Sequence, residues 1–355
     1  MTLAERATST SPFRASSTRR RPVLALGALL LAVPLAAVLD LVAGRALSIG
    51  ETWQALTGGA VDPIAHHLVW RVRLPRVLVA LGAGAGLGLA GLILQAALRN
   101  PLAAPEVTGV TPGAVLGAVA ATGVGLADAA SPATVVIAAL AGGLGGVGVL
   151  WLLTGRARSD PAETAVYGVL VSAALGGLTA VTLLAVPGQL GSVVQWMVGT
   201  TEARTWEHWA LLWPWTLGWA AVAWLTAGPL MLLRCGDQVA EAAGLVPARA
   251  RGLVLLCAVA LTAGAVAAVG ALGFVGLVVP HAALALCGGD LRVALPGAAL
   301  AGAVAVCGAD AVAQLLSRAV TGWGAEHLSI PVGAVTTCVG AAVLLFVARR
   351  HAVEP

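Results

Sequence analysis

Charge is what this 355-residue sequence has least of, because charged residues make up only 10% of it and lysine is absent. Hydrophobic residues make up 59%, and the mean hydropathy is +0.93. A soluble domain of this length needs far more charge to keep its surface solvated. The composition therefore excludes a soluble globular protein and predicts an all-α, polytopic membrane protein.

The absence of lysine also excludes one class of ATP-binding site. A P-loop needs a lysine after its glycines to reach the phosphates of the nucleotide. We therefore expect no cofactor in this chain, and an ATPase that drove it would be a separate subunit. The sequence also has no H-E-x-x-H motif and no clear nucleophile–base pair, so we expect no catalytic residues and no intramembrane enzyme.

Cysteine is scarce and scattered. Five cysteines are too far apart for a C-x-x-C motif, and four of them lie within apolar runs, where a free thiol behaves as a small hydrophobe. They are Cys235, Cys257, Cys287, Cys307 and Cys338. We predict neither a disulfide nor a metal site.

Apolar runs of membrane-spanning length fill most of the chain. Ten are visible, at 23–43, 77–97, 108–127, 133–153, 165–186, 209–233, 253–271, 273–287, 294–317 and 330–348. The eighth is too short to cross a bilayer alone, so we expect a half-helix or re-entrant element there. Residues 1–22 are rich in Ser, Thr and Arg and predict a disordered cytoplasmic tail before a membrane domain at 23–349. A twin-arginine signal is the alternative, but the first run is long for one and no clear cleavage site follows it.

The arginines predict the orientation. With ten spans and both termini in the cytoplasm, fourteen of the 20 arginines lie on inner segments, as the positive-inside rule expects for a bacterial cytoplasmic membrane. The outer ones are Arg45, Arg71, Arg73, Arg76, Arg204 and Arg318. Their cluster before the second run needs a separate explanation.

Two motifs are long enough to be specific. The first comprises R-L-P-R at 73–76, G-L-I-L-Q at 91–95 and R-N-P-L-A-A-P at 99–105. The second is G-A-L-G-F-V-G-L-V-V-P-H at 270–281, followed by Asp290, Arg292, Leu295-Pro296, Asp310 and Pro331-Val332-Gly333. Both resemble the FecCD-type permeases, the membrane subunits of bacterial ABC importers for iron–siderophores, haem and cobalamin, with spacing that holds from about Arg71 to Gly340.

The resemblance implies a type II ABC-importer permease that forms a homodimer or heterodimer around a central path. A coupling loop at about 234–251 would receive one ATPase subunit, with Asp237, Ala240 and Gly244 at the positions of the family's coupling pattern. Independently, Gly236 and Gly244 bracket a short helix with Asp237 near its N-terminus, where a carboxylate complements the helix dipole. A merely solvated loop is the alternative.

The resemblance also implies that outer arginines pair with glutamates of an extracytoplasmic binding lipoprotein or periplasmic protein. We assign this role to Arg73 and Arg76, since arginine forks suit carboxylates. Snorkelling at the interface is the alternative, and it applies most to Arg71. In the family a third arginine follows the aspartate that corresponds to Asp310, and this sequence has Gln314 at that position. Arg318, one helical turn further, could take the role of the missing arginine.

The remaining motif residues are interpreted structurally. Asn100, Pro101 and Pro105 set a rigid turn, Gln95 and Asp310 are polar within spans, and we expect an interhelical hydrogen bond from Asp310 rather than a proton relay. We expect His281, which follows Pro280, to be a structural polar anchor. Gly276, Pro331 and Gly333 are further motif positions to which we assign a structural role. The adjacent His66 and His67 are expected in an exposed loop.

Departures from the family pattern occur at Leu284, Ala243 and Ala342, so a heterodimer with a more typical permease stays open. An ion-coupled secondary transporter is the main rival, but it would need paired intramembrane charges, and only Asp310 qualifies. Nothing suggests a nucleic-acid partner. The chelate itself cannot be read from this sequence.

Overall fold

The computed structural model describes residues 20–44, 47–59, 62–123, 125, 132–154, 161–185, 196–321 and 329–353. Its elements are the helices α1 (Arg20–Ala43), α2 (Ile49–Thr57), α3 (Pro63–His67), α4 (Leu74–Leu98), α5 (Val110–Gly123), α6 (Pro132–Thr154), α7 (Pro161–Ala185), α9 (Trp206–Leu225), α10 (Ala227–Cys235), α11 (Asp237–Ala242), α12 (Pro247–Val269), α13 (Val275–Cys287), α14 (Leu291–Thr321) and α15 (Val332–Val353). A π-helical segment, η1 (Leu68–Arg73), joins α3 to α4, and a 3-10 turn, η2 (Pro105–Thr108), precedes α5. Most of the predicted N-terminal tail lies outside the described residues.

Each of the ten predicted apolar runs contains a helix. Within the described residues, six helices are long and apolar enough to cross a membrane, and α9 with α10 adds a seventh if this pair, bent by 55°, is one span. The three shorter apolar helices, Val110–Gly123, Val275–Cys287 and Val332–Val343, fall in the remaining runs. The eighth run is indeed short, since α13 has 13 residues.

The structure adds one local feature and corrects one expectation. The sixth run is not one continuous helix, since it breaks at Thr226 between α9 and α10. His66 and His67 were expected in a loop, but they form the last turn of α3, where the His66 ring stacks on Trp70 with 6.1 Å between centroids. An Asp62 side chain that accepts from the Ile64 N–H caps this helix, which explains why a helix forms there.

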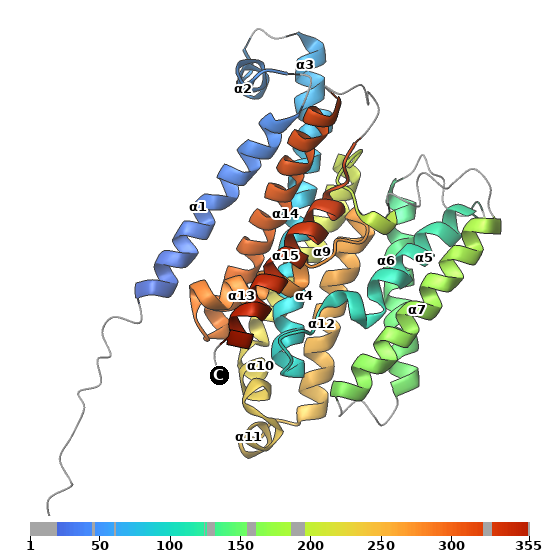
Figure 1. Cartoon of the computed structure of the whole chain (residues 1–355), viewed down its shortest axis with the longest axis vertical. Helices are drawn as coiled ribbons and strands as arrows, with labels where there is room; N and C mark the ends of the chain where they lie inside the picture. Colours follow the sequence, from blue (N-terminus) through green and yellow to red (C-terminus); the bar gives the residue numbers. More distant parts are fainter. Residues whose placement is uncertain are drawn as a thin grey trace, which may run out of the picture.

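Helix α4 is the centre of the fold and packs against α14, α12, α13 and α9 (Figure 1). Its glycines allow this close approach, because a Cβ on Gly84 or Gly88 would collide with the carbonyl oxygen of Gly302 or Ala298 on α14. Pro75 directly follows η1 in one continuous helical segment, Pro63–Leu98, and its missing N–H interrupts the hydrogen-bond ladder where the π-helical segment ends. Gly84 and Gly88 thus form a small-x-x-x-small face through which α4 packs on α14.

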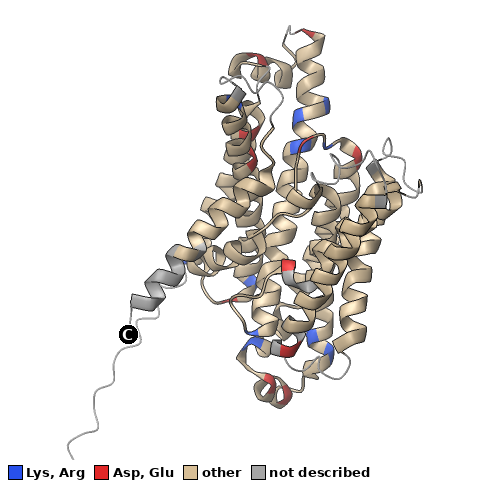
Figure 2. Cartoon of the chain, turned by 45° about the vertical axis from the view of Figure 1, so that its right-hand side comes forward, with Lys and Arg blue, Asp and Glu red and all other residues tan. Residues whose placement is uncertain are grey.

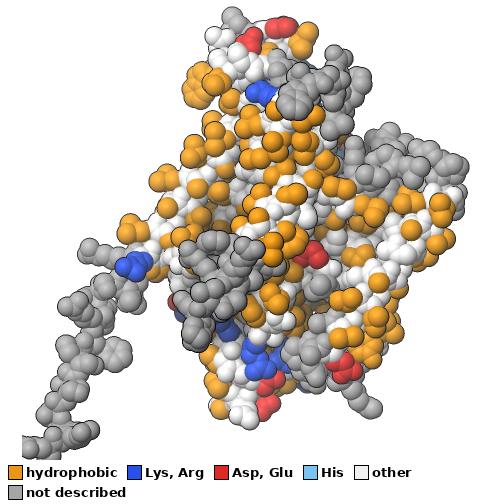
Figure 3. All heavy atoms as spheres, viewed as in Figure 1, with side chains coloured by type: hydrophobic (Ala, Val, Ile, Leu, Met, Phe, Trp, Pro, Cys, Tyr) orange, Lys and Arg blue, Asp and Glu red, His pale blue; other side chains and the backbone are white. Residues whose placement is uncertain are grey.

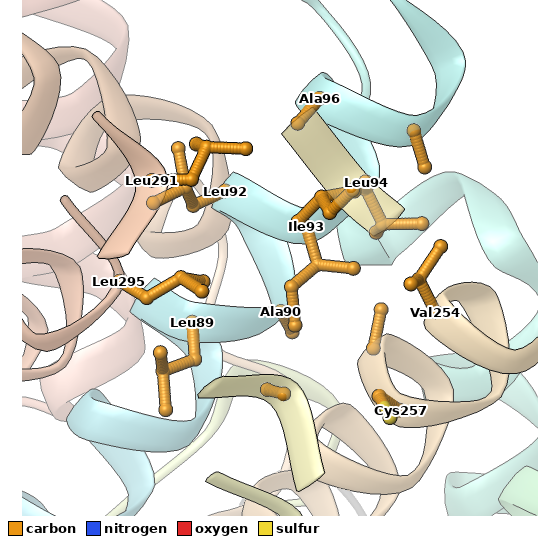
Figure 4. Close-up of a cluster of buried hydrophobic side chains, with 14 of the residues drawn as sticks. Leu89, Ala90, Leu92, Ile93, Leu94, Ala96, Val254, Cys257, Leu291 and Leu295 are labelled. Carbon is orange, nitrogen blue, oxygen red and sulfur yellow. The ribbon is translucent and has the colours of Figure 1, made fainter. Parts of the chain in front are cut away.

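Leucine and isoleucine side chains on the C-terminal half of α4 fill the largest described core cluster, with Val254 and Cys257 of α12 on one side and Leu291 and Leu295 of α14 on the other (Figure 4). A second group, α5, α6 and α7, packs through Gly113, Gly117, Gly142 and Gly146. Because no cavity-filling large side chains separate these backbones, the bundle depends on glycine contacts as well as on leucine packing.

The long axis of the molecule has two polar ends and an apolar middle. Charged residues gather toward the α2–α3 end and the α11 end in Figure 2, and Figure 3 shows hydrophobic side chains over most of the surface between them. Large apolar side chains on α1 and α7, such as Leu31, Leu35, Leu178 and Leu184, are exposed. This belt is the surface that a bilayer or a second membrane protein would cover.

Candidate functional site

The polar segment between the sixth and seventh predicted runs folds into α11 and its flanking turns. α11 begins after Gly236, with φ 117°, and ends in a turn at Gly244, with φ 81°, two conformations that favour glycine. The Leu245 N–H donates to the Ala240 carbonyl and the Gly244 N–H to the Glu241 carbonyl, each at 2.9 Å. The two glycines therefore determine where this short helix starts and stops.

Of the three predicted coupling residues, only Gly244 is exposed. Ala240 is fully buried and packs in the core cluster beneath α11, and Asp237 is half-buried. Val239 and Glu241 are exposed and point away from the bundle's core. An ATPase docked here would contact the side chains between the predicted residues, and the coupling role of Asp237, Ala240 and Gly244 stays a prediction.

Asp237 anchors α11 to two spans through charge. Its Oδ1 accepts from Nη2 of Arg251 at 2.6 Å and lies 3.5 Å from Nη2 of Arg99. Arg251 is in the first turns of α12 and Arg99 ends α4, so one carboxylate contacts both. Because α4 and α12 form the buried centre of the bundle, a displacement of α11 would be transmitted to it through this group.

At the opposite end, Arg76 and Asp310 form a bidentate ion pair between α4 and α14. Nε and Nη2 of Arg76 donate to the two carboxylate oxygens, each at 2.7 Å, and the Asp310 side chain is fully buried. The Thr201 hydroxyl donates to the same carboxylate at 2.6 Å. The predicted interhelical hydrogen bond of Asp310 is confirmed, and its principal partner is the arginine predicted to meet a binding protein.

The other outer arginines differ in accessibility. Arg73 is only 7% exposed, and its Nη1 donates to the Leu41 carbonyl at 2.8 Å and to the Thr52 hydroxyl at 3.4 Å. Arg318 is half-buried, whereas Arg71 is exposed. Within the described residues, Arg73 thus ties α1 and α2 to η1. Docking by Arg73, Arg76 and Arg318 stays a prediction, and Arg71 is the more accessible cation of this cluster.

Asp40 on α1 belongs to the same polar group, and sequence reasoning missed it. Nε2 of Gln314 donates to its Oδ1 at 2.5 Å, and the Cys307 thiol donates to its Oδ2 at 3.4 Å. Gln314, which occupies the position of a family arginine, therefore holds α1 against α14. A lone acid within an apolar run could have indicated this, because such residues almost always have a partner.

The loop between Val198 and α9 lies at the same end of the molecule as the Arg76–Asp310 ion pair. Nε of Arg204 donates to the Thr200 carbonyl at 3.3 Å, and its guanidinium lies 5.5 Å from the Trp196 ring centroid. Burial lowers the pKa of Arg204 to about 10, since the charged form loses hydration. Arg204 thus braces a loop that also supplies Thr201 to the ion pair.

The two sequence motifs meet where α4 crosses the start of α13. A Cβ on Gly91 would collide with the Gly276 carbonyl oxygen, and a Cβ on Gly276 would collide with the Pro105 ring. Nε2 of Gln95 donates to the Leu277 carbonyl at 3.1 Å across the same crossing. Three backbone segments touch here, which requires small residues at these motif positions.

His281 also contacts this crossing from within α13. Its Nδ1 lies 2.8 Å from the Leu277 carbonyl, and because a carbonyl only accepts, the ring donates this bond. This bond lies within α13, where His281 follows the buried Pro280, and the anchor role of His281 stays a prediction. Asn100 shapes the turn after α4 as expected, since its Oδ1 accepts from the Leu102 N–H at 2.9 Å, with Pro101 exposed beside it.

The last motif positions fasten α15 to the rest of the fold. The Gly333 N–H donates to the Gly199 carbonyl at 3.0 Å, and a Cβ on Gly333 would collide with the Val198 carbonyl oxygen. Pro331 precedes the helix and accepts from the Ala334 N–H at 3.1 Å. α15 therefore begins in direct backbone contact with the loop at 196–200.

A cleft of about 420 Å³ opens beside α15, and its one ionisable carboxylate is Glu106 on η2. Oε1 of Glu106 accepts from the Phe274 N–H at 3.0 Å, whereas Oε2 is buried without a hydrogen-bond partner among the described residues. The cleft also contains Met197, Thr337 and Cys338. Sequence reasoning missed Glu106, although an acid directly after the motif proline was visible.

Comparisons with known proteins agree with this architecture. The profile of the FecCD transport family matches residues 29–350. The Fe(3+)-citrate import system permease protein YfmE of Bacillus subtilis (strain 168) is 32% identical over 335 residues, 94% of this chain and 97% of that protein. The cobalamin import system permease protein BtuC of Halobacterium salinarum is 33% identical over 320 residues, 87% of this chain and 82% of that protein.

A solved structure is also similar. An inward-facing conformation of a metal-chelate type ABC transporter superposes with a TM-score of 0.79 at 28% sequence identity, covering 92% of this chain and 98% of that one. The likeness extends over nearly the whole length of both chains.

Proposed function

Since the chain belongs to the FecCD transport family and is a membrane-spanning permease subunit of an ABC importer, we propose that its cargo is a metal chelate, an iron–siderophore or a related complex such as haem or cobalamin. The relatives named for ferric citrate and cobalamin support this class. The observation that carries the mechanism is α11, a short polar helix whose glycine ends and Asp237 contacts join it to α4 and α12.

The proposed partners are an ABC ATPase at α11, a second permease, and an extracytoplasmic substrate-binding lipoprotein or periplasmic protein at the α2–α3 end. ATP would bind only in the ATPase subunit, and this chain would catalyse no reaction. Both termini and α11 would lie on the cytoplasmic side of a bacterial cytoplasmic membrane, as the arginine distribution supports.

In this mechanism ATP binding moves the ATPase subunits, which shift α11. Asp237 transmits the shift to Arg99 and Arg251, and hence to the ends of α4 and α12. Because the α4 crossing with α13 is a contact between backbones, the two spans move together rather than deform separately. The central path would thereby change the side to which it opens.

Affinity purification of the tagged chain from its own membranes tests the ATPase partner. We expect a P-loop ATPase to copurify with the wild type and to be lost with Gly244→Arg, because the new side chain stands at the end of α11. Gly288→Arg is the matched control: both glycines have φ 81° and open space around a Cβ, so the two changes bring the same backbone strain.

Recovery of an ATPase with wild type and Gly288→Arg alone supports the coupling segment. Equal recovery with both variants would remove α11 from the interface, and absence of any ATPase under conditions that preserve known ABC complexes would overturn the ABC assignment. The cargo class is tested by uptake of labelled iron chelates and cobalamin in cells that lack, and then regain, this gene. Uptake that is independent of the gene for both cargo types would contradict it.

A further inference from the structure

Glu106 lies near the midplane of the membrane. Its neighbour Phe274 directly precedes α13. The 13 residues of α13 place Phe274 about 20 Å from the inner end of this helix at Cys287, since an α-helix advances 1.5 Å per residue. Gly91, which touches Gly276 beside it, is seven residues and so roughly 10 Å from the inner end of α4. Both estimates bracket the centre of a hydrocarbon layer about 30 Å thick.

A carboxylate at this depth is not compatible with a lipid-facing surface. Placing an acid at the bilayer centre costs about 2.5–3.5 kcal/mol, so such residues face a water-filled path or a partner. No described cation pairs with Glu106, and only one of its oxygens accepts a hydrogen bond from the chain. The second oxygen needs a donor from outside the described residues.

The cleft next to Glu106 has the size and lining of a small-molecule contact. Its volume of about 420 Å³ lies within the range of ligand pockets, roughly 300–1,000 Å³. Met197 is 55% exposed in it and offers an adaptable thioether, while Thr337 and Cys338 are exposed on α15. The walls are otherwise apolar, from Leu272 and its neighbours, so Glu106 supplies the electrostatic character of the cleft.

We propose that the carboxylate of Glu106 sets the charge of an aqueous path along α15, and that it favours chelates presenting positive charge over chelates with a carboxylate surface. This rests on the proposed function, whose cargo class it narrows. A cation in the path would be attracted by an unscreened carboxylate, and an anion would be repelled by the same amount.

A purely structural role is the competing explanation, because Oε1 holds the N–H of Phe274, a residue with φ 65° at the start of α13. Two substitutions separate the roles. Glu106→Gln keeps a carbonyl oxygen for the Phe274 N–H and removes the charge, whereas Glu106→Met removes both. A charge effect appears in both variants, and a positioning effect appears only in Glu106→Met.

Cys338 is a native reporter of this cleft. Cys235 and Cys338 are the exposed cysteines among the described residues, and the remaining three are buried. In a Cys235→Ser background, an added thiol reagent therefore modifies Cys338. The experiment compares its rate of modification by a cationic methanethiosulfonate (ethyltrimethylammonium) and an anionic one (ethylsulfonate), in membrane vesicles, normalised to a free thiol. We expect the cation-to-anion ratio to fall on the order of tenfold in Glu106→Gln, and to stay unchanged in Glu207→Gln, an exposed acid at the start of α9.

Cargo preference is read from protection of the same thiol against a neutral maleimide. Ferrioxamine B, a trihydroxamate chelate with a free ammonium group, should slow Cys338 modification several-fold more than ferric dicitrate, and Glu106→Gln should abolish this difference. An unreactive Cys338, an unchanged charge ratio in Glu106→Gln, or equal protection by the two chelates would overturn the proposal. Failure of the ABC assignment would instead appear in the copurification, which does not involve this cleft.

Discussion

At the scale of single residues, two carboxylates differ in how many partners the chain gives them. Asp310 is fully buried and saturated by Arg76 and Thr201, so it holds helices together. Glu106 has one bonded and one unpartnered oxygen beside a cleft, and no described cation neutralises its charge. Both are acids in a nonpolar environment, and only the partners around them distinguish a structural group from a functional one.

We expect Asp310→Asn to destabilise the chain by about 3 kcal/mol, because it leaves the Arg76 guanidinium without its counter-ion in the bundle. Thermal unfolding in detergent would show this as a lowered midpoint. The control is the double variant Arg76→Met with Asp310→Leu, which replaces the pair by apolar side chains and should recover most of the loss. If the double variant is as unstable as the single one, the ion pair is not the cause.

At the scale of elements, backbone contacts at glycine set the packing. α4 touches α14 at Gly84 and Gly88 and touches α13 at Gly91, while α11 and α13 end at glycines with positive φ. Such contacts tolerate no added methyl group, so the spacing between α4 and its neighbours cannot adjust in small steps. The elements that carry the proposed motion are therefore rigidly joined.

Gly91→Ala should destabilise the bundle by about 1–3 kcal/mol, because its Cβ would occupy the position of the Gly276 carbonyl oxygen. Gly145→Ala in α6 is the matched control: it lies within a helix with open space around a Cβ, and it should be neutral or slightly stabilising. Unfolding midpoints of the two variants, measured side by side, check this. A Gly91→Ala midpoint equal to that of the control would show that α4 and α13 do not touch.

The small helix α2 offers a pH-dependent test. Backbone and side-chain hydrogen bonds from Ser48 lower the pKa of Glu51 from its ordinary value of 4.5. The resulting stabilisation is present above pH 4.5 and is lost as the pH falls through the lowered value. Amide exchange in α2 should thus be faster in Glu51→Gln than in wild type near neutral pH, and the two should converge in strong acid. A difference that persists in acid would contradict this role for the charge.

At the scale of the whole molecule, one face needs a protein partner rather than lipid to cover it. The face beside α15 combines an acid-bearing cleft with exposed side chains, and a bilayer would not solvate it. A second permease packed on this face would place its own cleft opposite this one, and the two clefts together would enclose one path. Whether that partner is a second copy or another chain depends on the side chains of both faces.

Particle masses of the complex purified in nanodiscs should accordingly correspond to two permease chains. Coexpression with two different tags identifies the partner: recovery of both tags together indicates a homodimer, and recovery of another permease indicates a heterodimer. A complex that contains one permease chain and its ATPase would contradict the enclosed path.

Composition and motif spacing alone determined the class of this protein, because a bilayer demands long apolar helices and the two motifs demand small residues and prolines at set positions. The ten runs, the short α13 and the glycine-bounded α11 follow from these local requirements. The bend at Thr226, the pairing of Arg76 with Asp310 and the unpartnered oxygen of Glu106 do not, since each depends on which distant segments come together. Asp310 lies 234 residues from its arginine, and Glu106 lies 168 residues from Phe274. Only the tertiary structure decided which charges are satisfied within the chain and which remain available to another molecule.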